Sequence, residues 1–155
     1  MSAQNYDLVV GIDRSDRTLD ICERSREGNC DHSVISTDPS HLHQWWEDLR
    51  ARVPGPIAVA FEQPAINLLA FFEGKQVDVF ALNPSSTYSY RQSLKVSRAR
   101  TDSTDASSIA AFVWTHAVDL TPHSYGCPRA RELRNLSIAR RRLVDQRTCL
   151  TNRLQ

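Results

Sequence analysis

The 155-residue sequence is poor in the features that mark several common protein classes. Its 5 glycines never cluster, which disfavours a nucleotide site built on glycine-rich phosphate loops. The 4 cysteines form no Cys-x-x-Cys pair, and no cationic and apolar leader precedes Tyr6. No apolar run reaches the roughly twenty residues that span a bilayer. We therefore expect a cytoplasmic protein with free thiols and no membrane partner.

Acidic residues are scarce in the last part of the chain. The formal net charge is only +1, but after Pro128 eight arginines face two acids, Glu132 and Asp145, which gives this tail +6. The rest of the chain keeps 11 of the 19 basic and 16 of the 18 acidic side chains, a net charge of −5. Such asymmetry indicates a partner that is a polyanion or an acidic protein surface.

Acids are also absent from residues 85–100, which have no clear hydrophobic period and predict neither a helix nor a strand. The aromatic and basic side chains in this segment are Tyr88, Tyr90, Arg91, Lys95, Arg98 and Arg100. Together they can stack bases and neutralise phosphates, so they are our candidate nucleic-acid contacts. A solvated surface loop would have the same composition.

Apolar runs, caps and breakers predict an α/β order for residues 1–120. The expected strands are 8–12, 18–22, 33–36, 57–61 and 77–82. Helices are expected to begin at 37–39, at Pro64 and at Asp102, the first two ending near Arg52 and Gly74. Three meandering strands, then helix, strand, helix, strand and helix, describe a mixed sheet flanked by helices, which is the order of the ribonuclease H-like fold.

A long helix is expected over 129–155, after a linker over 121–128. Its leucines fall near a 3.5-residue spacing and are Leu133, Leu136, Leu143, Leu150 and Leu154. This spacing favours the start of a coiled coil, and hence a homo-oligomer, although Arg140 and Arg147 occupy two seam positions. Because no cap precedes Gln155, we interpret the chain as a fragment.

Four carboxylates stand where such a fold could bring them together. Asp13 and Glu62 each end a buried strand, and open α/β sheets bind ligands around strand ends. Asp102 and Asp105 open the third helix and share one of its faces. Taken alone, this pair is most simply helix-start chemistry, because acids favour the positive end of a helix dipole.

Taken together, the four carboxylates indicate a metal site. Converging carboxylates repel one another at neutral pH unless cations neutralise them, and oxygen ligands select hard ions such as Mg²⁺ or Mn²⁺. Two such ions about 4 Å apart can clamp the attacking and leaving oxygens of a phosphodiester. The set Asp13, Glu62, Asp102 and Asp105 therefore predicts metal-dependent phosphoryl transfer on nucleic acid.

Several motifs resemble those of the DEDD transposases of insertion-sequence family 110. They are VVGID at 9–13, Glu62 after its strand, ALNP at 81–84, RTDSTDA at 100–106 and the leucine- and arginine-rich 133–154. The resemblance covers essentially the whole chain. It implies a RuvC-like catalytic domain whose metal-binding tetrad is Asp13, Glu62, Asp102 and Asp105.

The resemblance also implies DNA recombination guided by a structured bridge RNA. In that family a coiled coil leads to a C-terminal domain with a serine nucleophile, which we expect to lie outside this sequence. No serine here is therefore assigned as the nucleophile.

Other functions stay open from the residues. A stand-alone magnesium-dependent nuclease, such as a Holliday-junction resolvase, would use the same carboxylates with water in place of the serine. A non-catalytic RNA-binding and oligomerisation module would bind without hydrolysis. An actin-like ATPase shares the Gly-Ile-Asp start but ordinarily needs the glycine-rich loops that are missing here.

Overall fold

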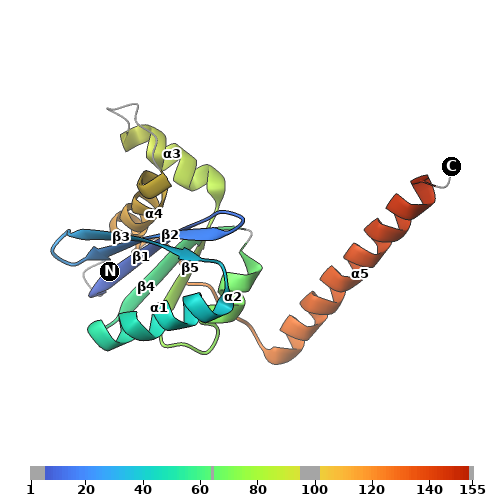
Figure 1. Cartoon of the computed structure of the whole chain (residues 1–155), viewed down its shortest axis with the longest axis horizontal. Helices are drawn as coiled ribbons and strands as arrows, with labels where there is room; N and C mark the ends of the chain where they lie inside the picture. The colour runs from blue at the N-terminus through green and yellow to red at the C-terminus, as the bar shows by residue number, and fades with distance from the viewer. Residues whose placement is uncertain (1–5, 64, 95–101, 154–155) are drawn as a thin grey trace. The chain divides into compact units, whose positions relative to one another are not determined.

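The computed structural model describes residues 6–63, 65–94 and 102–153 (Figure 1). Two compact units make up the chain, Met1–His123 and Ser124–Gln155. The described elements of the first unit are β1 (Leu8–Arg14), β2 (Thr18–Ser25), β3 (Cys30–Ser36), α1 (Pro39–Arg52), β4 (Ile57–Glu62), α2 (Ile66–Phe72), β5 (Asp78–Leu82), α3 (Pro84–Leu94) and α4 (Asp102–His116). The second unit contains α5 (Pro128–Arg153). The predicted division into a domain over 1–120, a linker over 121–128 and a helix over 129–155 stays a prediction.

The sheet is mixed and five-stranded, with the order β3-β2-β1-β4-β5. The antiparallel meander β1-β2-β3 forms one side of it, and β4 and β5 add in parallel to β1. This is the mixed α/β sheet that the sequence predicts. All four cysteines are free, as expected, and no helix in the described ranges is long and apolar enough to cross a membrane.

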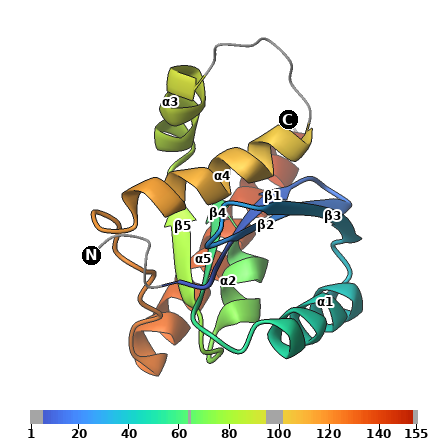
Figure 2. The same cartoon turned by 90° about the vertical axis from the view of Figure 1, so that its left-hand side faces the viewer.

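Helices cover both faces of the sheet, as Figure 2 shows: α4 lies along one face, and α1 and α2 lie across the other. The core under α1 and α2 takes one set of alternating strand residues, among them Val10, Ile12 and Phe61. The core under α4 takes the other set, among them Val9 and Ala60. Alternation along β1 and β4 thus decides which helix each strand residue faces.

The start of α1 follows the predicted cap. Asp38 is the N-cap and accepts a hydrogen bond of 2.8 Å from the Ser40 backbone N–H, and Pro39 occupies the first turn. Trp45 and Trp46 lie on the buried face of this helix. The helix ends at Arg52, where the sequence predicts its end.

The prediction that residues 85–100 form neither a helix nor a strand is wrong for their first part, because Pro84–Leu94 forms α3. Asn83 Oδ1 accepts hydrogen bonds from the Ser85 backbone N–H (3.0 Å) and hydroxyl (2.8 Å), as an N-cap side chain does. The helix lacks an apolar stripe because its inward face carries polar side chains, such as the buried Thr87. Asn83-Pro84, which reads as the stop of a strand, is also the start of this helix.

One glycine sets the distance between α4 and the sheet. A Cβ atom on Gly11 in β1 would lie 2.2 Å from the Ala106 carbonyl oxygen and 2.6 Å from the Ala110 backbone nitrogen of α4. Ala106 and Ala110 are themselves fully buried. Backbone therefore packs on backbone here, and the N-terminal turns of α4 come close to the end of β1.

Replacing Gly11→Ala is expected to lower the free energy of unfolding by about 3 kcal/mol, because a clash with backbone atoms is relieved only by moving the helix. Urea unfolding measures this change. Gly28→Ala is the control, since a Cβ there meets nothing within 4 Å and strains only a φ of +91°, at a cost of about 1 kcal/mol. Equal losses in the two variants would contradict the close-packing argument.

Candidate functional site

Asp13 and Glu62 lie side by side at one edge of the sheet. The parallel strands β1 and β4 pair Ile12 with Phe61, so the next residue of each strand, Asp13 and Glu62, reaches the same carboxyl edge. Both continue the alternating set that begins with Val9 and Ala60, which faces α4. Pairing register and alternation thus bring these two carboxylates to the same place.

Asp105 enters from the first turns of α4, directly before Ala106, which packs on Gly11. Its side chain is 40% exposed, and its Oδ1 lies 3.3 Å from Nη1 of Arg91. The Asp105 carboxylate therefore forms an ion pair with Arg91 and does more than stabilise the start of the helix. Asp102 is the first residue of α4, and its side chain lies outside the described part of the structure.

Two residues of α3 bind Glu62. The Thr87 hydroxyl donates to Glu62 Oε1, with the Pro84 carbonyl oxygen 3.0 Å away as its other acceptor. Nη2 of Arg91 donates to the same Glu62 oxygen. Thr87 and Arg91 are one helical turn apart and share a face. Thr87 is a functional residue that the sequence alone does not indicate. Its spacing from Arg91 becomes a signal only once Asn83-Pro84 is recognised as the start of a helix.

The charges of the three carboxylates affect one another. Burial raises the pKa of Asp13, and repulsion by Asp105 and Glu62 raises it further. The guanidinium of Arg91 and a hydrogen bond from the Arg14 backbone act in the opposite direction. Asp13, Glu62 and Asp105 therefore form one electrostatic group, in which Arg91 is the cation.

The donor atoms in this group fit a hard divalent cation, since all are carboxylate oxygens. A polar hollow opens beside them, lined by Asp13, Arg14, Ser15, Asp16, Glu62 and Gln63. Among the side chains that the structure describes, however, no three acidic, histidine or cysteine groups are placed to hold a metal ion together. Arg91 instead bridges Glu62 and Asp105.

The candidate nucleic-acid contacts have different environments. Tyr88 on α3 is 53% exposed, whereas the Tyr90 ring packs edge-on against Phe112, with centroids 5.3 Å apart. Arg91 is only 20% exposed and is held by carboxylates, so the acids missing from its own segment are supplied by β4 and α4. The remaining three candidates, Lys95, Arg98 and Arg100, lie outside the described residues.

Replacing Asp13→Asn is expected to raise the melting temperature by a few degrees at neutral pH. A carboxyl whose pKa is raised on folding stabilises the fold only while it is protonated, and this stability is lost as pH rises through the native pKa. At neutral pH the Asp13 charge is therefore destabilising, and the asparagine removes it. The gain should vanish near the ordinary aspartate pKa of about 4.

The matched control is Asp16→Asn, an exposed aspartate in the turn after β1, which should leave the melting temperature unchanged. Thermal unfolding of both variants across pH makes the comparison. A lower melting temperature for Asp13→Asn at neutral pH would show that the Asp13 charge stabilises the fold.

Comparisons with known proteins identify the fold and the family of this chain. In the Thermus thermophilus RuvC structure, the matched region has 20% sequence identity, covers 75% of this chain and 99% of that one, and superposes with a TM-score of 0.53. This likeness confirms the ribonuclease H-like, RuvC-like fold. No curated protein gives a match. A family model described as "Transposase" matches residues 10–155, nearly the whole sequence. The chain therefore belongs to the DEDD transposases of insertion-sequence family 110.

Proposed function

We propose that this chain is the metal-binding catalytic part of a DNA transposase, in which Asp13, Glu62, Asp102 and Asp105 hold Mg²⁺ or Mn²⁺ during strand cleavage and exchange. Membership of a transposase family and a RuvC-like fold point to an enzyme that cleaves nucleic acid. The observation that carries the finer proposal is the meeting of Asp13, Glu62 and Asp105 in one electrostatic group.

The position of this group suits the chemistry. Asp13 and Glu62 come from neighbouring parallel strands and Asp105 from a helix locked to β1, so the carboxylates rest on rigid elements. A divalent ion bound to them would supply the positive charge that stabilises a phosphodiester under attack. Thr87 holds Glu62 in place from α3. Asp102, one turn before Asp105, would complete the oxygen ligands.

The nucleic-acid partners are DNA and a structured guide RNA. The exposed Tyr88 can stack on a base, and Lys95, Arg98 and Arg100 add charge for phosphates. The arginines of α5 supply a second basic surface. An RNA-guided reaction is the form of this function that the family resemblance implies, and the free thiols favour the cytoplasm as its location.

Metal binding tests the proposal directly. Titration calorimetry with Mn²⁺ should show binding to the unaltered chain. Asp105→Asn and Glu62→Gln should each weaken it by on the order of tenfold or more, because even outer partners of a metal site contribute this much. The control is Glu47→Gln, an exposed acid on α1, across the sheet from the site. Equal Mn²⁺ affinity in all four proteins would contradict the proposed metal site.

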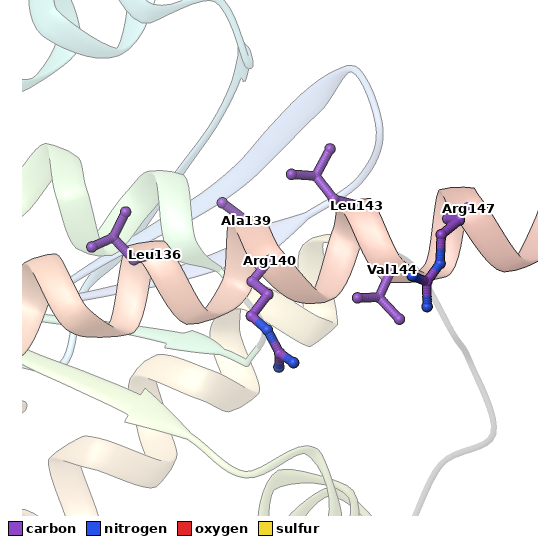
Figure 3. A pocket seen from close by; sticks show the side chains of 6 residues that line it. All are labelled: Leu136, Ala139, Arg140, Leu143, Val144 and Arg147. Carbon is purple, nitrogen blue, oxygen red and sulfur yellow. The ribbon is translucent and has the colours of Figure 1, made fainter.

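Self-association of α5 is the second part of the proposal. Leu133, Leu136, Leu143 and Leu150 are each at least 60% exposed. Figure 3 shows the central stretch of this face, where a shallow apolar groove is lined by Leu136, Ala139, Arg140, Leu143, Val144 and Arg147. A second copy of α5 would cover the leucines by coiled-coil packing. Arg140 and Arg147 on the same face would weaken a symmetric pair.

Replacing Leu143→Asp is therefore expected to weaken self-association by on the order of a hundredfold, because a charge would be buried without a partner. Sedimentation equilibrium over a range of concentrations measures the change. Thr148→Asp adds the same charge on another side of α5 and should leave association unchanged. A monomeric unaltered chain at all concentrations would contradict this part of the proposal.

A further inference from the structure

Arg91 is the cation already present among the proposed metal ligands. Its guanidinium pairs with Glu62 through Nη2 and with Asp105 through Nη1, the latter at 3.3 Å. The side chain is only 20% exposed. Its Nε is buried without a hydrogen-bond partner among the described atoms. An arginine on the surface would keep that N–H in water, so this side chain is drawn into the site by its carboxylates.

The charges explain why an arginine is held there. Asp13, Glu62 and Asp105 repel one another, as the raised pKa of Asp13 reflects, and Arg91 reduces this repulsion. Arg14 is nearby, but its contact with Asp13 is through the backbone, and its side chain is exposed. In the described part of the site, Arg91 is thus the one basic side chain paired with these carboxylates.

A divalent ion and Arg91 would compete for the same oxygen atoms. Glu62 Oε1 already accepts hydrogen bonds from Arg91 and from Thr87, and Asp105 Oδ1 pairs with Arg91. Mg²⁺ needs its oxygen ligands at about 2.1 Å in a near-octahedral shell. A planar guanidinium between two carboxylates leaves no room for such a shell, in agreement with the lack of a preformed metal site among the described side chains.

We propose that Arg91 is a tethered counter-ion that occupies the carboxylate site in the metal-free protein and must be displaced for the divalent ion to bind. This inference rests on the proposed metal-binding function. Arg91 holds the carboxylates together before the metal arrives and lowers the affinity for it. Thr87 is neutral and rotates freely at its hydroxyl, so it can keep its contact with Glu62 after Arg91 leaves. Because arginine does not deprotonate in proteins, the displacement depends on metal concentration rather than on protonation of Arg91.

Mn²⁺ titration of Arg91→Gln tests the inference. The variant should bind Mn²⁺ more tightly than the unaltered chain, by about tenfold or more, because the two charge-assisted pairs of Arg91 no longer have to be broken first. The matched control is Arg52→Gln, which removes an arginine that pairs with Glu23 at 3.0 Å. It should leave the Mn²⁺ affinity unchanged. Unchanged or weaker binding by Arg91→Gln would overturn the inference, because Arg91 would then be neutral or helpful to the metal.

The same titration distinguishes a failure of the inference about Arg91 from a failure of the proposed metal site. If the unaltered chain binds Mn²⁺ and Arg91→Gln binds it no more tightly, the inference about Arg91 is wrong and the proposed metal site stands. If neither protein binds Mn²⁺ at millimolar concentration, the proposed metal site is wrong and the inference fails with it.

A second measurement is made on the unaltered chain and requires only that the Arg91 signal be assigned. The Nε–H resonance of Arg91 in a ¹H–¹⁵N spectrum should move when Mg²⁺ is added to the unaltered chain, because the guanidinium leaves its carboxylates. The Arg52 resonance, held by Glu23, should stay in place. If Mg²⁺ binds and the Arg91 signal does not move, the guanidinium remains paired and the inference is overturned.

Discussion

The close contact between β1 and α4 at Gly11 is the constraint on which the site depends. Without a side chain at this position, the backbone of α4 at Ala106 and Ala110 rests directly on the strand. Asp13 follows Gly11 by two residues on the same face, and Asp105 directly precedes Ala106. The separation of these carboxylates is therefore fixed by backbone packing rather than by flexible side chains. A close-packed core transmits small displacements, so a change that moves α4 on β1 would alter both the stability of the fold and the geometry of the site.

Repulsion between the carboxylates is the cost of this arrangement. A fold selected for stability alone would place neutral side chains at the edge of β1 and β4, because like charges in a half-buried site destabilise it. Arg91 and Thr87 of α3 offset part of that cost by binding Glu62. The helix α3 therefore has a role that its sequence, with no apolar stripe, does not suggest: it is held by polar contacts and in turn holds the site.

The framework could be predicted from the sequence because it follows from periodicity. Alternating residues in β1 and β4 decide their faces, and each strand carries an acid as its last or next-to-last residue. The pattern alone therefore predicts that Asp13 and Glu62 lie close together. The start of α1 was readable from Asp38 and Pro39 for the same local reason. The helix α3 was missed, because its contacts with Glu62 and Asp105 are distant in sequence and polar, and no hydrophobic period records them.

Arg91 shows how composition can mislead about charge. In its own segment it is one of several basic residues with no acid nearby, the composition of a nucleic-acid contact, yet in space it faces carboxylates from β4 and α4. Charge balance is a property of the folded neighbourhood, and here the paired carboxylates come from two other elements.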